Sequence, residues 1–85
     1  MSDGPNSDSD LFHEETADPL VADRRNFFKV ELWSRDGQHI DRLLFAGNSL
    51  DKARVAFEAY ARKRPRARLT IRQRTRLVAQ WPRER

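Results

Sequence analysis

The chain has no cysteine and only three glycines among its 85 residues. Without thiols, neither a disulfide nor a thiolate-bound metal can hold the fold together, so its stability must come from packing. The glycines are isolated, which excludes a glycine-rich phosphate-binding loop. No apolar run approaches the ~18 residues of a membrane-spanning helix, and the acidic N-terminus is unlike a signal peptide. These absences predict a cytoplasmic protein with no membrane span.

The sequence also lacks a set of residues that could carry out catalysis. Its two histidines are His13 and His39, and neither has a metal-ligand partner at helical or hairpin spacing. Ser34 and Ser49 have no adjacent base that would activate them as nucleophiles. We therefore expect no enzymatic activity, no metal, no cofactor and no small-molecule substrate.

What the chain does contain is charge, and that charge is unevenly distributed. Residues 1–24 hold seven acidic side chains and one basic one, whereas residues 49–85 hold twelve basic and three acidic ones. The formal net charge of +4 therefore hides two opposed poles. Within residues 62–76, eight of the fifteen side chains are Lys or Arg and none is acidic. So much like charge must be solvated, screened or bound to an anion.

The composition divides the chain into three parts. Residues 1–25 are polar and acidic without an apolar period, which predicts a disordered tail, since such a segment cannot offset the entropy of ordering. This tail either keeps the protein in solution or competes with a polyanion for the basic end. Residues 26–82 form the folded domain, and residues 83–85 form a charged C-terminal stub. A domain of about 60 residues is marginally stable alone, so self-association is a further source of stability.

Residues 27–46 predict a β-hairpin. β-Branched and aromatic side chains alternate from residue 27 to residue 33, and a second strand follows at residues 39–46. The Asp36-Gly37 pair between them is a strong hairpin signal, because Gly tolerates the positive φ of the tight turn. The register of a two-residue turn pairs Val30 with Leu43, Phe28 with Phe45, Glu31 with Arg42 and Trp33 with Ile40.

A helix is predicted over residues 49–64. Asn48 or Ser49 supplies the N-cap oxygen, and Pro65 ends the helix. An apolar stripe at helical spacing faces the hairpin, and it consists of Leu50, Ala53, Ala56, Phe57 and Tyr60.

A second hairpin is predicted over residues 68–81, with Arg74 and Thr75 in its turn. The expected register pairs Ile71 with Val78 and Leu69 with Gln80, and it places Trp81 beside Arg68 on the face that carries Thr70 and Arg72. Together these elements predict an α+β fold of ββαββ order, with one helix packed on an antiparallel sheet.

The basic cluster is the leading candidate for a functional site. Guanidinium groups bind phosphates bidentately and stack on bases, and a sheet face with cations around an aromatic side chain can bind a nucleic-acid strand. We therefore expect a small accessory or regulatory protein that binds a polyanion, and nucleic acid in particular. A solvated arginine-rich surface with no ligand is the alternative. The expected binding residues are Arg62, Lys63, Arg64, Arg66, Arg68, Arg72, Arg74, Arg76 and Trp81.

A protein-interaction surface is the second candidate. One helix cannot cover both faces of a four-stranded sheet, so the outer face of the first hairpin is expected to carry exposed apolar residues. A homodimer or another protein partner would cover them. These residues are Phe27, Trp33, Ile40 and Leu44.

Several motifs resemble those of short uncharacterised bacterial proteins with a hairpin–helix–hairpin domain. They are Val30-Glu31-Leu32-Trp33-Ser34-Arg35-Asp36-Gly37, Ala53-Arg54-Val55-Ala56-Phe57, Leu69-x-Ile71-Arg72 and Arg76-Leu77-Val78-Ala79-x-Trp81-Pro82. The resemblance covers residues 27–82 and implies a standalone domain. It implies no activity.

Overall fold

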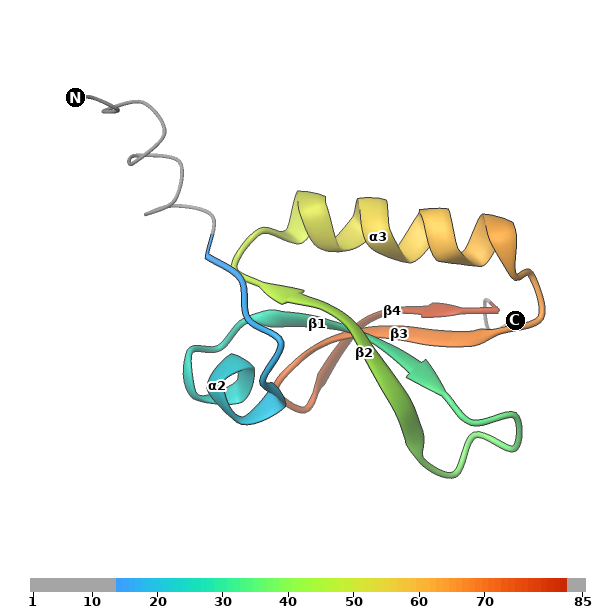
Figure 1. Ribbon diagram of the computed structural model, residues 1–85, viewed down its shortest axis with the longest axis horizontal. Coiled ribbons are helices and arrows are strands. Elements are labelled where there is room, and N and C mark those ends of the chain that lie inside the picture. The colour runs from blue at the N-terminus through green and yellow to red at the C-terminus, as the bar shows by residue number, and fades with distance from the viewer. Residues whose placement is uncertain (1–13, 83–85) are drawn as a thin grey trace.

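A four-stranded antiparallel sheet with the strand order β2-β1-β3-β4 organises the chain (Figure 1). The computed structural model describes residues 14–82. The elements are α2 (Pro19–Arg24), β1 (Phe28–Trp33), β2 (Ile40–Gly47), α3 (Leu50–Lys63), β3 (Arg68–Gln73) and β4 (Arg76–Trp81). From β1 onward their order is ββαββ, which confirms the predicted α+β fold with one long helix on the sheet.

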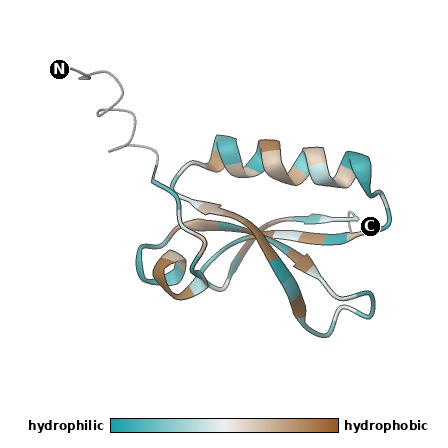
Figure 2. Ribbon diagram, in the orientation of Figure 1, coloured by the Kyte–Doolittle hydropathy of each residue, from teal (hydrophilic) through white to brown (hydrophobic). Residues whose placement is uncertain are grey.

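The helix α3 begins and ends where the sequence predicts. Ser49 is its N-cap, and its side chain accepts a hydrogen bond from the backbone N–H of Lys52 at 3.2 Å. The C-cap is Arg64, directly before Pro65. The helix packs over β1, β2 and β3, and Figure 2 shows hydrophobic residues along the strands beneath it. The main core cluster consists of Val30, Ala53, Phe57, Ala61, Leu69 and Ile71.

The folded region extends further toward the N-terminus than predicted. Residues 1–13 of the expected tail lie outside the described residues, but residues 14–25 are part of the fold. Glu15 forms a β-bridge with Gly47, and the N–H of Thr16 donates to the carbonyl of Ala46 at 2.9 Å. The fold therefore includes residues on the N-terminal side of the expected boundary at residue 26.

The short helix α2 has caps that fix both of its ends. Asp18 is the N-cap and accepts from the N–H of Leu20 at 2.9 Å, and Pro19 occupies the first helical position, which suits its fixed φ. Beyond the C-cap, Asn26 has a φ of 60°, so the chain turns away from the helix there.

The helix α2 covers part of the sheet face opposite α3 (Figure 1). Ala22, Phe27 and Ala46 are buried there as a second, smaller cluster. Because Ala46 pairs with Lys29, it lies on the face opposite Val30. The domain is therefore three layers thick at this end.

Two β-bulges change the register of the first hairpin. Trp33 pairs with Ile40 as predicted, but register shifts between Leu32 and Trp33 and between Val30 and Glu31 each add one residue to β2. The other predicted pairs are wrong: Val30 pairs with Phe45, Phe28 with Gly47 and Glu31 with Leu43. A bulge at Leu44 turns the side chains beyond it to the other face of the sheet.

One bulge has the same effect in the second hairpin. The turn at Arg74 and Thr75 is correct, since Gln73 pairs with Arg76, and Arg74 itself takes the positive φ, at 57°. A register shift between Ile71 and Arg72 then makes the remaining predicted pairs wrong: Ile71 pairs with Ala79 and Leu69 with Trp81. Trp81 consequently lies on the face that α3 covers.

Candidate nucleic-acid interface

The predicted basic residues do not form one continuous patch. Arg66 and Arg68 lie where β3 begins, whereas Arg74 and Arg76 lie at the turn where it ends. A strand rises about 3.3 Å per residue, so the six residues of β3 place the two groups roughly 17 Å apart. They must therefore be considered separately.

Arg72, between the two groups, is bound within the protein. Its Nε donates to Glu31 Oε1 at 2.7 Å and its Nη2 donates to Glu31 Oε2 at 2.9 Å. Glu31 is only 3% exposed. Hydrogen bonding to Glu31 raises the pKa of the Arg72 guanidinium above its ordinary value. Arg72 therefore neutralises a buried carboxylate, and the predicted pair of Glu31 with Arg42 is wrong.

Other polar groups extend this pair into a network on the face opposite α3. Thr70 Oγ1 donates to Glu31 Oε1 at 2.9 Å, and Trp33 Nε1 donates to Thr70 Oγ1 at 2.8 Å. Lys29 is also buried, with its Nζ 2.6 Å from Asp23 Oδ1 and 3.7 Å from Glu31 Oε2. The network therefore connects β1, β3 and α2.

The turn residues also have partners of their own. Arg74 Nε donates to the carbonyl oxygen of Asp23 at 2.9 Å, which joins the second turn to α2. Arg76 Nη2 donates to Gln73 Oε1 at 2.5 Å. Neither residue lies near the end of α3, where most of the basic residues are found.

The remaining cations gather around a groove at the C-terminal end of α3, which we call the basic groove. It encloses about 870 Å³ between α3, the α3–β3 connection and the first hairpin. Its aromatic lining is Trp33 and Tyr60. Its cations are Arg35, Lys63, Arg64, Arg66 and Arg68.

The charge of the basic groove is not balanced within the described chain. No acidic residue lines it, and among residues 14–82 none of its five cations is in an ion pair. Lys63 and Arg64 lie at the end of α3, where a cation stabilises the helix dipole. Arg35, Arg66 and Arg68 have no comparable role in a helix.

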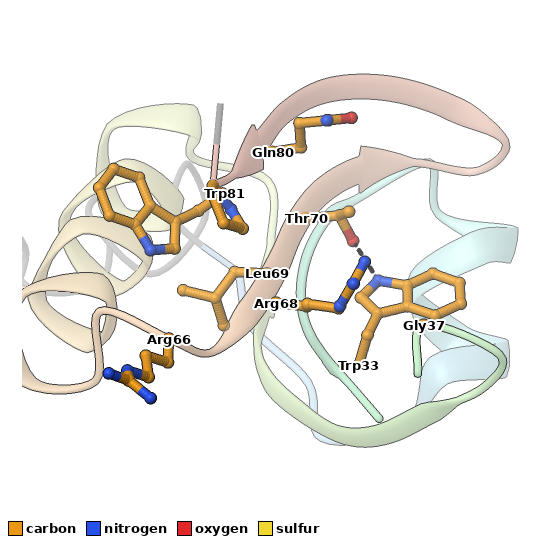
Figure 3. A pocket seen from close by; sticks show the side chains of 9 residues that line it. Trp33, Gly37, Arg66, Arg68, Leu69, Thr70, Gln80 and Trp81 are labelled. Carbon is orange, nitrogen blue, oxygen red and sulfur yellow. Dashed lines mark hydrogen bonds between the residues drawn. The ribbon is translucent and has the colours of Figure 1, made fainter. Parts of the chain in front are cut away.

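A smaller hollow adjoins the basic groove and shares Trp33, Arg66 and Arg68 with it (Figure 3). In Figure 3 the Arg68 side chain extends toward Trp33, its partner across β1 and β3. Arg68 also lies against the first turn, because a Cβ at Gly37 would be 3.2 Å from Arg68 Nη1. The turn and the start of β3 therefore form one surface.

Trp81 does not share a sheet face with Arg68 as predicted. In Figure 3 it points away from Arg68, toward α3. Its indole Nε1 donates to the carbonyl oxygen of Pro65 at 2.9 Å, and its ring packs against the main core. Arg62, also predicted to bind, lines a different groove between α3 and β4. Of the nine predicted binding residues, the basic groove unites Lys63, Arg64, Arg66 and Arg68.

The expected exposed apolar surface on the first hairpin is not formed. Phe27 is buried beneath α2, and Leu44 packs against the main core. Trp33 is half-buried, and Ile40 alone of the four is exposed. The protein-interaction role of these residues stays a prediction.

Sequence reasoning missed three side chains of the basic groove. Trp33 was expected in the exposed apolar surface of the first hairpin and Tyr60 in the apolar stripe of the helix, and Arg35 was not among the expected binding residues. Arg35 reaches the groove because Trp33 pairs with Arg68, which brings the first turn beside the start of β3. The pairing of β1 with β3 carries no local sequence signal.

Comparisons of the chain with protein-family models, curated proteins and solved structures gave no match. None of the helices within residues 14–82 has the length and apolar character needed to cross a membrane.

Proposed function

We propose that the protein binds single-stranded nucleic acid in the basic groove and acts as a small, non-enzymatic accessory protein in the cytoplasm. The observation that carries this proposal is the groove itself, which combines five cations and two aromatic side chains with no acidic residue. Cations neutralise the phosphate backbone, and aromatic rings offer surfaces on which bases stack.

The chemistry of the groove favours a single strand over a duplex. The bases of a single strand can turn outward and reach Trp33 or Tyr60, whereas those of a duplex are stacked on one another. Four of the five cations are Arg, whose planar fork binds phosphate oxygens bidentately.

Salt-dependent binding to labelled oligonucleotides tests the proposal. We expect single-stranded DNA or RNA to bind more tightly than a duplex of the same sequence in fluorescence anisotropy. If five phosphates are neutralised, a plot of the logarithm of the binding constant against the logarithm of the salt concentration has a slope of about −3.5. The triple variant Lys63→Ala/Arg66→Ala/Arg68→Ala should lower the affinity at least about tenfold and make that slope less steep by about 2.

A charge-matched control separates the groove from the overall charge of the protein. The variant Arg24→Ala/Arg42→Ala/Arg76→Ala also removes three positive charges, all from exposed side chains outside the groove. We expect it to keep most of the affinity and the slope. An equal loss in both triple variants would show that binding depends on diffuse charge, and the groove would then not be the site.

A further inference from the structure

Trp33 is held in place by its neighbours, although part of its ring borders two cavities. Its indole Nε1 donates to Thr70 Oγ1 at 2.8 Å, and the guanidinium carbon of Arg72 lies 5.7 Å from the ring centroid. Trp33 lines both the basic groove and the smaller hollow beside it, whereas Arg72 lines neither. The ring therefore presents a surface to these cavities that Arg72 does not cover.

The hydrogen bond that holds the indole has a fixed direction. An ionised carboxylate only accepts hydrogen bonds, so the Thr70 hydroxyl donates its one proton to Glu31 Oε1, at 2.9 Å. An indole N–H only donates, and the Thr70 oxygen accepts it. Glu31 is buried and receives two hydrogen bonds from Arg72. Thr70 thus fixes the orientation of Trp33 through a chain of groups that cannot reverse.

The smaller hollow has the size and the lining of a site for one planar ligand. It encloses about 380 Å³, and ligand sites in proteins typically enclose about 300–1,000 Å³. Beside Trp33 it is lined by Thr70 and by Gln80, the partner of Thr70 across β3 and β4 (Figure 3). The Gln80 amide can both donate and accept. It therefore suits the edge of a nucleobase, on which donors and acceptors lie side by side.

The cations around the smaller hollow lie where a strand that enters it needs them. Arg66 and Arg68 line both the hollow and the basic groove, and Lys63 and Arg64 continue the groove at the end of α3. No acidic residue lines either cavity. A base in the hollow therefore leaves its own phosphates beside Arg66 and Arg68 and the next ones beside the end of α3.

We infer that the smaller hollow is a base site, which takes one unpaired nucleobase stacked on Trp33, and that Thr70 is the residue that positions the ring. The inference rests on the proposed function and deepens it, because the basic groove binds phosphates whereas the hollow requires a base. Every base offers a flat face to an aromatic ring, so the site accepts strands of any sequence.

Trp33 is better placed for this contact than the other aromatic side chains nearby. Tyr60 lines the basic groove but not the smaller hollow, and it packs against the main core. Trp81 borders the hollow, but its side chain points toward α3 and donates to the carbonyl oxygen of Pro65 (Figure 3).

A strand without bases separates the base contact from the phosphate contacts. Fluorescence anisotropy compares labelled oligothymidine with a strand of the same length made of abasic sites, which carries the same phosphates. We expect the wild-type protein to bind the abasic strand about tenfold more weakly, because it cannot stack. Trp33→Leu should bind both strands equally. Tyr60→Leu is the matched control, since it removes the other aromatic ring of the basic groove, and it should still discriminate between the strands.

Two variants of Thr70 test its positioning role. Thr70→Val keeps the shape of the side chain without the hydroxyl, so we expect it to lose most of the discrimination between the strands, whereas Thr70→Ser keeps the hydroxyl and should retain it. Thermal unfolding followed by circular dichroism establishes that each variant is folded. The fluorescence of Trp33 in a Trp81→Phe background is a second readout, which oligothymidine should quench and the abasic strand should not.

The outcomes distinguish the base site from the proposed function. If the wild-type protein binds both strands equally, or if oligothymidine leaves the fluorescence of Trp33 unchanged, the base site is overturned and the phosphate contacts of the basic groove stand. A folded Trp33→Leu variant that still discriminates would place the base elsewhere and also overturn it. A folded Thr70→Val variant that still discriminates would overturn the role of Thr70. If the wild-type protein binds neither strand, the proposed function and the base site both fail.

Discussion

On the face of the sheet that α3 covers, Val30, Leu69 and Ile71 are almost fully buried in an apolar cluster. On the opposite face, Lys29 and Glu31 are buried almost as completely, yet both carry charge and hold specific partners. Two layers of similar depth in one small sheet are thus stabilised by different interactions.

The difference concerns what each face requires of its residues. An apolar cluster requires approximately the right volume and shape, and it tolerates exchange among hydrophobic side chains. A buried carboxylate requires donors at fixed positions, because an unpartnered charge in the interior is costly. We therefore expect the face with Glu31 to specify which strands pair and in which register, and the α3 face to supply more of the stability.

The largest expected effect comes from the apolar face. Leu69→Ala removes a fully buried side chain and leaves a cavity, so we expect a loss of about 3 kcal/mol in the free energy of unfolding. Val55→Ala, at an exposed position on α3, should cost less than about 1 kcal/mol. Urea denaturation measures both. Similar losses would contradict the assignment of the core to the α3 face.

A smaller loss is expected on the charged face. Glu31→Gln keeps the shape of the side chain but removes the charged partner of Arg72 and leaves Lys29 with Asp23 alone, so we expect a loss of about 2 kcal/mol. In a double-mutant cycle, Arg72→Gln should lower the free energy of unfolding by about 1 kcal/mol less in the Glu31→Gln variant than in the wild type. Additive losses would mean that the two side chains do not act together. Asp41→Asn, on the exposed edge of β2, should have almost no effect.

The smallest effect concerns a carboxylate on neither face. The Ser34 hydroxyl donates to Asp36 Oδ1 at 2.6 Å and the N–H of Gln38 donates to it at 3.0 Å, and these hydrogen bonds lower the pKa of Asp36 below its ordinary value of 3.8. Because the pKa is lower in the folded state, ionised Asp36 stabilises the fold when the pH is above the ordinary pKa. This contribution is lost as the pH falls through the pKa of the folded state.

We therefore expect the free energy of unfolding of Asp36→Asn to fall less than that of the wild type as the pH drops below about 4. At neutral pH, Glu31→Gln should cost the same free energy of unfolding with or without Asp36→Asn. Thermal unfolding at a series of pH values measures this. If the stability of Asp36→Asn falls in acid as steeply as that of the wild type, the carboxylate of Asp36 contributes nothing to folding.

The sequence signals that predicted this fold correctly are local ones. Ser49 and Pro65 delimit α3, Asp36-Gly37 marks the first turn, and strand alternation identifies both hairpins. The helix α2 had such signals too, an Asp18 N-cap followed by Pro19, but six residues are too few to form a stable helix alone. It exists because Ala22 packs against the sheet, which the local sequence does not reveal.

What could not be predicted follows from the three bulges. Each bulge adds one residue to a strand and reverses the face of the residues beyond it as far as the next bulge, and no residue type marks its position. This is why Trp81 and Leu44 lie on the α3 side. The candidate site was predicted in part for the same reason. The charge cluster was visible in the sequence, but its division by Arg72 depends on a pairing between β1 and β3 that only the fold establishes.

The segment at residues 14–16 has a consequence for the size of any assembly. It covers the end of the β2 edge at Ala46 and Gly47, and two bulges and two charged residues interrupt the rest of that strand. A chain that associates through its sheet therefore has one open edge, at β4, and growth ends at two copies. Without these features every added copy would expose a place for the next, and the particle of finite size would become a filament.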